Sequence, residues 1–178
     1  MSEKLEKGLI QVYTGNGKGK STAAFGLALR ALGCGLDVVI IQFMKTGIDY
    51  GEIKALDIFK PKLTLLSFGR PGFISRTGAT EQDIELAQQA MEKTTNIIQN
   101  RPVDLLILDE INNALYYQLL ETKNVLNFLE QKPERTEIVL TGRHAPEEII
   151  VKADLVTEML EIKHPYKKGI RARKGIEY

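Results

Sequence analysis

The sequence predicts an α/β fold in which helices flank a mostly parallel sheet. Three observations support this prediction: short β-branched apolar runs recur along the chain, helical segments separate them, and a glycine-rich turn joins the first apolar run to the first helix. Uninterrupted apolar runs are typical of strands that are buried on both faces, as they are in parallel sheets. At 178 residues the chain suits one domain, which we expect to span residues 1–178.

The first half of the chain contains three of the expected strands and two of the expected helical segments. An Ala- and Leu-rich helix is predicted over 21–33, and Gly33 and Gly35 end it. A shorter helical segment is expected over 52–59. The strands are expected at 9–13, 37–43 and 62–68.

Thr80 begins the most clearly marked helix of the second half. The sequence Thr-Glu-Gln-Asp at 80–83 resembles a capping box, and apolar residues follow at helical spacing as far as Ile98. Pro102 closes that segment. The remaining expected elements are strands at 103–108, 137–141 and 155–162, a helix at 115–131 broken near Thr122, and a helix at 146–152.

Composition narrows the classes of function. Lys and Arg total 24 against 23 acidic residues, so the net charge of +1 gives no general reason to expect nucleic acid as a partner. Apolar runs stay well below the roughly 18 residues of a membrane span, so no membrane partner is expected. Cys34 is the single cysteine and the N-terminus lacks the apolar stretch of a signal peptide, which favours the cytoplasm.

Scarce residue types also limit the chemistry. With two histidines, His144 and His164, and one cysteine, the chain does not supply the usual Cys/His set of a structural zinc site. A Gly-x-Ser-x-Gly turn, typical of acyl-transfer enzymes, does not occur in the sequence. An enzymatic reaction would therefore depend on phosphate binding, a metal ion and the substrate itself.

The stretch TGNGKGKS at 14–21 indicates a phosphate-binding loop. Its glycines allow several backbone N–H groups to approach an anion, and the helix N-terminus that follows adds partial positive charge. Lys20 supplies a cation, and the Ser21 hydroxyl can ligate magnesium. The stretch matches the P-loop pattern except that Thr14 replaces its first glycine. A glycine turn without a ligand is the alternative, but the order strand, loop, helix favours a nucleoside triphosphate and a P-loop NTPase fold of the RecA-like type.

The segment VDLLILDE at 103–110 supports that hypothesis. An apolar strand that ends in two carboxylates is typical of a Walker B segment, which reaches toward the magnesium of the P-loop. Asp109 or Glu110 would contact the metal directly or through water, or Glu110 would instead orient water for hydrolysis. The guanine-reading signature Asn-Lys-x-Asp does not occur in the sequence, which favours ATP over GTP.

The C-terminal segment 141–178, TGRHAPEEIIVKADLVTEMLEIKHPYKKGIRARKGIEY, strengthens a more specific identification. Together with TGNGKGKS, DVVIIQFMK and LDEINNAL, it resembles the P-loop class of ATP:corrinoid adenosyltransferases, and the resemblance covers essentially the whole chain after the first eight residues. It implies transfer of the 5′-deoxyadenosyl group of ATP to the cobalt of a reduced corrinoid, with release of tripolyphosphate, in biosynthesis or salvage of coenzyme B12. It also implies Mg²⁺ or Mn²⁺ as cofactor, a homodimer, and an external flavoprotein as reductant.

The resemblance also implies roles for particular residues. Ser21, Asp109 and Glu110 would hold the metal, and Lys20 and Glu110 would be the catalytic residues. Arg143 is a further candidate phosphate contact, although Arg143 and His144 also suit a surface ion pair and a structural role. The residues expected to bind the ATP phosphates are Gly15, Asn16, Gly17, Lys18, Gly19, Lys20, Ser21 and Thr22.

This residue inventory is compatible with the implied reaction. Cob(I)alamin is a strong nucleophile that carries no proton to remove, so its attack on the ribose 5′ carbon requires no histidine or cysteine base. The enzyme has to position two substrates and stabilise the charge that gathers on the departing triphosphate. A loop of N–H groups with Lys18, Lys20 and a divalent ion suits that task.

The tail at 163–178 is basic and has two interpretations. It is either a solvated tail or a strap that folds over an anionic ligand at the site. A nucleic-acid role has little support because Tyr166 and Tyr178 are its only aromatic residues. The basic residues are Lys163, Lys167, Lys168, Arg171, Arg173 and Lys174.

Two other classes of function share the P-loop. A small-molecule kinase would form ADP and a phosphorylated acceptor, and a regulatory ATPase would form ADP and phosphate at a rate that depends on a partner. The kinase would want an acceptor base and an arginine-rich lid, which no segment clearly resembles. The Asn-Asn pair after Asp-Glu and the C-terminal tail favour the adenosyltransferase.

The loop FGRPGFISRTGAT at 68–80 is the expected corrinoid-facing element, and Phe73 is its candidate contact. Phe73 would press against the corrin or displace the lower ligand of cobalt, or it simply packs within the protein. Some relatives of this class carry a tryptophan two residues further on, where this chain has Ser75.

Phe73→Ala is expected to impair the reaction from cob(II)alamin more than the reaction from chemically reduced cob(I)alamin. The reason is that loss of the lower ligand makes cob(II)alamin easier to reduce. Initial rates of adenosylation from the two corrinoid states measure this difference. Equal losses on both would remove the proposed role of Phe73 in cobalt reduction.

Overall fold

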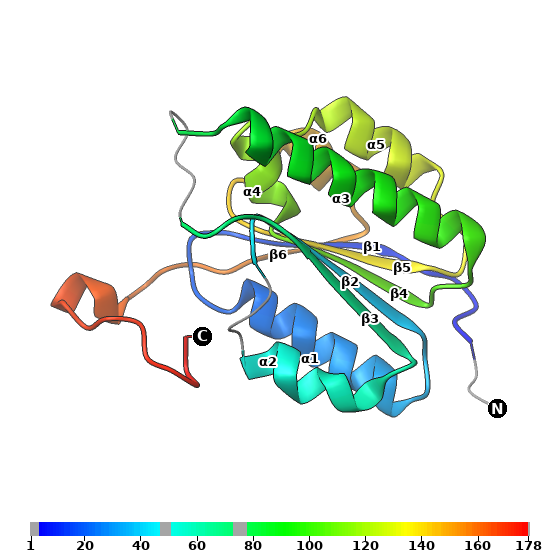
Figure 1. Ribbon diagram of the computed structural model, residues 1–178, viewed down its shortest axis with the longest axis horizontal. Helices are drawn as coiled ribbons and strands as arrows, with labels where there is room; N and C mark the ends of the chain where they lie inside the picture. Colours follow the sequence, from blue (N-terminus) through cyan, green and yellow to red (C-terminus); the bar gives the residue numbers. More distant parts are fainter. Residues whose placement is uncertain (1–3, 47–50, 73–77, 178) are drawn as a thin grey trace.

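The computed structural model describes residues 4–46, 51–72 and 78–177, and a six-stranded parallel sheet forms its centre (Figure 1). The strand order is β3-β2-β4-β5-β1-β6. The prediction of an α/β fold with a parallel sheet flanked by helices is confirmed, and the arrangement is consistent with a P-loop NTPase fold. The strands are β1 (Ile10–Thr14), β2 (Val38–Phe43), β3 (Leu63–Phe68), β4 (Leu105–Asp109), β5 (Glu137–Thr141) and β6 (Leu155–Glu158).

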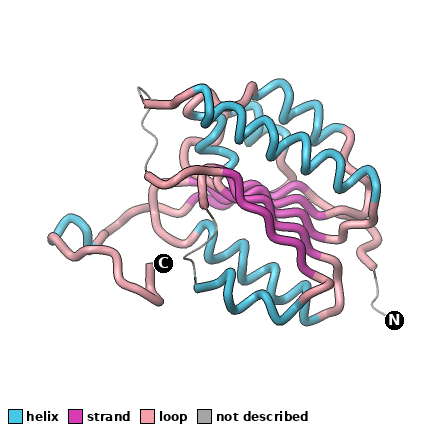
Figure 2. The backbone as a smooth tube through the Cα atoms, in the orientation of Figure 1, coloured by secondary structure: helices cyan, strands magenta, loops and turns pink. Residues whose placement is uncertain are grey.

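Helices cover both faces of the sheet (Figures 1 and 2). The first face carries α1 (Lys20–Gly33) and α2 (Gly51–Leu56), and a short 3₁₀ turn at Asp57–Phe59 follows α2. A second 3₁₀ turn, at Pro165–Lys168, lies in the tail. The opposite face carries α3 (Glu81–Asn100), α4 (Ile111–Tyr116), α5 (Thr122–Glu130) and α6 (Glu147–Lys152).

Alternation along the strands creates two hydrophobic cores. In β2, Val39 and Ile41 pack with the layer of α3 to α6, whereas Val38 and Ile40 pack with α1. All six residues of β2 are buried, as expected for a central strand that is covered on both faces. This double burial explains why the strands are apolar runs in the sequence without polar alternation.

Two predicted elements differ from the structure. The helix predicted at 115–131 with a break near Thr122 is confirmed as two helices, and α5 begins at Thr122, but α4 starts earlier than predicted, at Ile111, directly after the left-handed Glu110. The strand predicted at 155–162 ends at Glu158, because Met159 leaves the sheet to bond the P-loop. Within the described residues, no helix is both long and apolar enough to cross a membrane.

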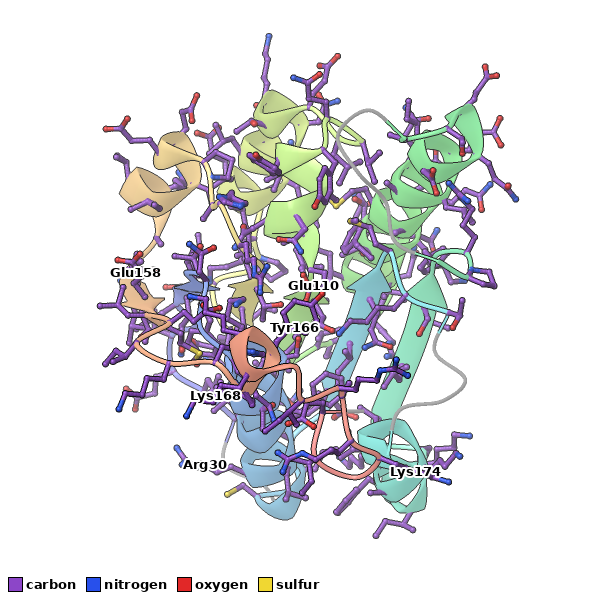
Figure 3. The ribbon with its side chains drawn as sticks, turned by 90° about the vertical axis from the view of Figure 1, so that its left-hand side faces the viewer. Arg30, Glu110, Glu158, Tyr166, Lys168 and Lys174 are labelled. Carbon is purple, nitrogen blue, oxygen red and sulfur yellow. The ribbon has the colours of Figure 1, made fainter. Side chains whose placement is uncertain are left out.

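The parallel sheet brings the functional segments to one edge. The loop after β1, the carboxylates after β4 and Arg143 after β5 all follow the carboxyl ends of their strands, where α/β proteins bind their ligands. β5 lies between β1 and β4, so these three segments are neighbours. After β6 the chain crosses the same side of the molecule, where Figure 3 shows Tyr166, Lys168 and Lys174 on the face that also carries Glu110.

Thr80→Ala is expected to lower the free energy of unfolding by about 1 kcal/mol, the usual loss on removing a helix N-cap. The predicted capping box is present: the Thr80 hydroxyl accepts a hydrogen bond from the Asp83 N–H, and the Asp83 carboxylate accepts one from the Thr80 N–H. Urea unfolding measures the change.

Thr95→Ala is the matched control in the same helix, because its hydroxyl only donates to the Met91 carbonyl, a contact that adds little stability. If the two variants lose equal stability, the cap makes no special contribution.

Candidate active site

The glycine-rich loop at 14–21 connects β1 to α1 and is shaped by the chain that follows β6. Gly15 and Gly19 have positive φ angles of 92° and 122°, which favour glycine. The Met159 carbonyl accepts a hydrogen bond from the Gly17 N–H at 2.6 Å. A Cβ atom at Gly15 or Gly17 would lie 2.5 Å or 2.7 Å from the Met159 oxygen. The loop therefore needs glycine for its own turn and for close contact with the segment after β6.

Lys20 begins α1 and is folded onto its own loop. Its Nζ donates to the carbonyl oxygens of Gly15 and Gly17 at 2.8 Å and 2.7 Å, and the residue is only 8% exposed. Burial lowers the pKa of the Lys20 ammonium, and the nearby charge of Glu110 partly opposes this effect. Lys20 is thus an ammonium held in the loop by neutral acceptors.

Lys18 is paired with the C-terminal tail. Its Nζ donates to the Ile176 carbonyl at 2.8 Å and to Glu177 Oε1 at 3.0 Å. Arg173 also binds the Glu177 carboxylate, and hydrogen bonds to Arg173 and Lys18 lower its pKa to about 2. The tail contact to the loop is therefore made by an acidic residue, although most charged residues of the tail are basic.

Asp109 ends β4 with a carboxylate that has no exposed surface. Its Oδ1 accepts from the Thr141 hydroxyl at 2.8 Å, and its Oδ2 accepts from Gln42 Nε2 at 3.1 Å and from Lys45 Nζ at 2.7 Å. Burial alone would raise the pKa of Asp109, but the charge and hydrogen bond of Lys45, together with the Ser21 and Thr141 hydroxyls, lower it. Asp109 is therefore an ionised buried acid.

Glu110 differs from Asp109 in its electrostatics. Burial and the adjacent Asp109 charge raise the pKa of Glu110. Its Oε2 accepts from Asn113 Nδ2 at 2.5 Å, and its backbone N–H donates to the Thr141 hydroxyl at 2.9 Å. Glu110 has a φ of 67°, in the left-handed region, directly after β4.

Arg143 lies beside the P-loop, as its placement after β5 requires. Its Nη2 donates to the Asn16 carbonyl at 3.4 Å, and its backbone N–H donates to Asn113 Oδ1 at 2.6 Å. Asn113 thereby connects Arg143 to Glu110. The His144 ring stacks on Tyr116 with centroids 4.2 Å apart.

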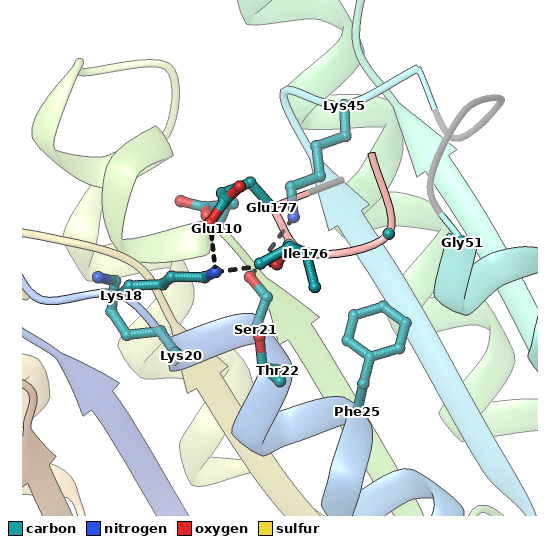
Figure 4. A pocket seen from close by; sticks show the side chains of 12 residues that line it. Lys18, Lys20, Ser21, Thr22, Phe25, Lys45, Gly51, Glu110, Ile176 and Glu177 are labelled. Carbon is teal, nitrogen blue, oxygen red and sulfur yellow. Dashed lines mark hydrogen bonds and ion pairs between the residues drawn. The ribbon is translucent and has the colours of Figure 1, made fainter. Parts of the chain in front are cut away.

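Most of these residues line two adjoining cavities, the first of which is shown in Figure 4. The first, of about 460 Å³, contains Lys18, Lys20, Ser21, Thr22, Phe25 and the tail residues 175–177. The second, of about 530 Å³, includes Tyr117, Arg143, His144 and His164. Lys18, Lys20, Lys45, Glu110 and Glu177 line both. The arrangement offers two adjacent spaces whose shared border carries three lysines and two glutamates.

The predicted site residues come together here, except Phe73, whose position the structure does not describe. The P-loop residues, the Asp109–Glu110 pair and Arg143 border the cavities or contact residues that do. Phe73 lies outside the described residues. Gly72, immediately before it, lines the second cavity.

Sequence reasoning missed several residues that contact the site. Lys45, Gln42, Thr141, Asn113 and Glu177 were not predicted. Lys45 follows a predicted strand and Thr141 ends one, both at the edge of the sheet where ligands bind. This position in the sequence could have indicated that they contact the site. Glu177 had none, because its contact depends on the return of the tail.

The oxygen donors fit a magnesium ion. Within the described residues no cluster of three or more His, Cys, Asp or Glu side chains has metal-binding geometry. Mg²⁺ in phosphate sites typically takes one or two protein ligands and keeps water and phosphate oxygens. Ser21 Oγ and Asp109 Oδ2 both contact the Lys45 ammonium, at 3.4 Å and 2.7 Å, so these two oxygens are placed to bind one cation together.

Comparison with known proteins places this chain in a family. Residues 6–178 match the model of the family described as ATP:corrinoid adenosyltransferase BtuR/CobO/CobP. A corrinoid adenosyltransferase from a Sinorhizobium species is 42% identical over 175 residues, which are 97% of this chain and 81% of the relative. Corrinoid adenosyltransferases of Pseudomonas aeruginosa and Escherichia coli K12 are 39% and 33% identical, each over 97% of this chain and 85% and 87% of their own lengths. The chain belongs to the ATP:corrinoid adenosyltransferase family, whose members make adenosylcobalamin.

Proposed function

We propose that the P-loop binds the triphosphate of ATP as a leaving group, and that the adjoining cavity admits the reduced corrinoid. The observation that carries this proposal is the set of three ammonium groups, of Lys18, Lys20 and Lys45, on the border shared by the two cavities. Cationic groups on that border are suited to negative charge that develops between two bound substrates.

The transfer itself requires no proton movement. The cobalt electron pair attacks the 5′ carbon of ATP, the bond from that carbon to the triphosphate oxygen breaks, and its electrons leave with tripolyphosphate. Among the described residues of the first cavity there is no histidine or cysteine. Its lysines, hydroxyls and loop N–H groups match a reaction whose main demand is to stabilise the leaving group.

In the proposed mechanism the triphosphate replaces internal partners of the lysines. Lys20 exchanges the Gly15 and Gly17 carbonyls for phosphate oxygens, and Lys18 exchanges Glu177. Arg143, beside Asn16, gains a phosphate contact. Charged phosphate oxygens are stronger acceptors than neutral carbonyls, so the exchange at Lys20 favours the nucleotide complex.

Ser21, Asp109 and Glu110 are the proposed ligands of Mg²⁺ or Mn²⁺. The ion, when bound, would neutralise charge on the triphosphate and so make it a better leaving group. Asp109 suits this task because the Thr141 hydroxyl and Gln42 amide hold its carboxylate in a fixed orientation. Asn113 similarly orients Glu110.

We propose that the C-terminal tail, residues 163–178, folds over the nucleotide. Support comes from Ile176 and Glu177, which already contact Lys18 at the mouth of the first cavity (Figure 4). Release of Glu177 by the triphosphate would leave Arg173 and its basic neighbours free to bind the anion.

The resemblance to the adenosyltransferase family also supports three further proposals. Phe73 is the corrinoid contact, an external flavoprotein is the reductant, and the cytoplasm is the location.

Product analysis distinguishes this function from a kinase or a regulatory ATPase. Under anaerobic conditions, magnesium-ATP and chemically reduced cob(I)alamin should give a light-sensitive cobalt–carbon product and tripolyphosphate in equal amounts. Visible absorbance and phosphate chromatography follow the two products. Formation of ADP without alkylated cobalt would contradict the proposal and favour one of the other two functions.

Lys20→Ala is expected to lower the rate of adenosyl transfer at least about 100-fold, since it removes a charged donor to the leaving group. Single-turnover rates at saturating ATP test the loss, and circular dichroism tests whether the fold is intact. Lys93→Ala, on the exposed surface of α3, is the control and should retain the wild-type rate. Unchanged transfer by Lys20→Ala would overturn the P-loop assignment.

We further propose a homodimer that covers β6. All four residues of this edge strand are exposed, including Leu155 at 43% and Val156 at 42%. Strands of parallel sheets are normally covered, and an open apolar edge is a site of association.

Val156→Lys is expected to shift the protein from dimer to monomer, because a lysine on an edge strand opposes pairing. Light scattering after size-exclusion chromatography gives the mass. The control Ile58→Lys replaces another exposed apolar residue, 80% exposed, away from β6 and should remain dimeric. A monomeric wild-type protein would refute the proposed dimer.

A further inference from the structure

Lys45 contacts two of the three residues to which we assign the metal, Ser21 and Asp109. Its Nζ is 2.7 Å from Asp109 Oδ2 and 3.4 Å from Ser21 Oγ. The Lys45 side chain is 14% exposed and that of Asp109 has no exposed surface. Figure 4 shows Lys45 reaching from the end of β2 toward Ser21. The ammonium thus lies in a largely buried position where the Ser21 and Asp109 oxygens can bind a cation.

The backbone around Lys45 holds it in this direction. Met44 has a φ of 59°, and this left-handed turn comes directly after β2. The Met44 N–H donates to the Phe68 carbonyl at 2.8 Å. A Cβ atom at Gly69 would lie 2.4 Å from the backbone nitrogen of Lys45. Close packing of two strand ends therefore directs the side chain back into the site.

Charge balance makes Lys45 and a metal ion alternatives at Asp109. The buried carboxylate requires a cation, which Lys45 supplies. A divalent ion bound to the same oxygen would repel the ammonium strongly, because little solvent screens the two charges. Lys45 has a flexible stem, and its side chain borders both cavities, so the ammonium has another place to go.

We propose that Lys45 occupies the metal position of the nucleotide-free enzyme, yields it when metal and nucleotide bind together, and then binds the triphosphate. This inference rests on the metal site of the proposed function. It makes metal binding depend on the nucleotide, since the triphosphate provides the new partner for the displaced ammonium. Free metal alone has to expel Lys45 from Asp109 without that compensation.

Binding measurements without catalysis test this role. For Lys45→Met, the dissociation constant of Mn²⁺ in the absence of nucleotide should fall at least about tenfold, because the competing cation is gone. The dissociation constant of metal-free tripolyphosphate should rise at least about tenfold, because one of its cations is lost. Electron paramagnetic resonance of free Mn²⁺ and isothermal titration calorimetry give the two values. A residue that only maintains the fold would not shift the two constants in opposite directions.

Two further variants separate charge from shape and position. Lys18→Met removes another cation from the same border, and should weaken tripolyphosphate binding while leaving Mn²⁺ binding as in the wild type. Lys45→Gln removes the charge but retains a hydrogen-bond donor for Asp109, so it serves if Lys45→Met does not fold. Mn²⁺ should raise the unfolding temperature of the folded Lys45 variant more than that of the wild type.

Asp109→Asn distinguishes failure of this inference from failure of the metal site. If Asp109→Asn weakens Mn²⁺ binding in the presence of ATP, but the folded Lys45 variant binds Mn²⁺ no more tightly than the wild type, the metal site stands and the role of Lys45 is wrong. If the folded Lys45 variant binds tripolyphosphate as tightly as the wild type, Lys45 does not bind the triphosphate. If Asp109→Asn leaves Mn²⁺ binding with ATP unaltered, the metal site itself is wrong, and the inference fails with it.

Discussion

The site depends on the buried charge of Asp109. A carboxylate without exposed surface is stable only when hydrogen bonds and a counter-charge replace the water it has lost. Gln42 on β2, Thr141 on β5 and Lys45 after β2 provide these partners. Because β4 lies between β2 and β5, the strand order itself delivers both neighbours to Asp109. The geometry of the site is therefore a consequence of sheet topology together with one charge that must be balanced.

A second constraint joins the P-loop to the end of the chain. Met159 bonds Gly17, and the room for this contact exists only because Gly15 and Gly17 lack side chains. The glycines are thus explained partly by packing and partly by ligand access, and the two explanations are compatible. The same contact directs the chain after β6 across the site, from where Glu177 returns to Lys18.

Local sequence patterns predicted the features that depend on neighbouring residues. The apolar runs located the strands, and the Thr80–Asp83 box located the start of α3. TGNGKGKS, Asp109 and Glu110 marked segments that lie close together at the candidate site. Features that depend on distant contacts were missed. Lys45 enters the site through a left-handed turn packed against Gly69, and Glu177 through a tail contact across 159 positions of sequence. The break near Thr122 was predicted correctly, but the start of α4 at Ile111 was missed, because it depends on the left-handed turn at Glu110.

The internal partners of the three lysines bear on selectivity for a triphosphate. Lys18 is paired with Glu177, Lys20 with loop carbonyls and Lys45 with Asp109, so an anion gains only the difference between its own contacts and those it replaces. A small anion that draws one lysine away leaves a partner behind, and that cost is greatest for the buried Asp109. If ATP and the metal bind as proposed, a metal-bound triphosphate replaces several of these contacts at once and brings its own cation for Asp109. On that proposal, the pairing of the three lysines favours the complete substrate over its fragments, through the same buried charge that Gln42, Thr141 and Lys45 balance.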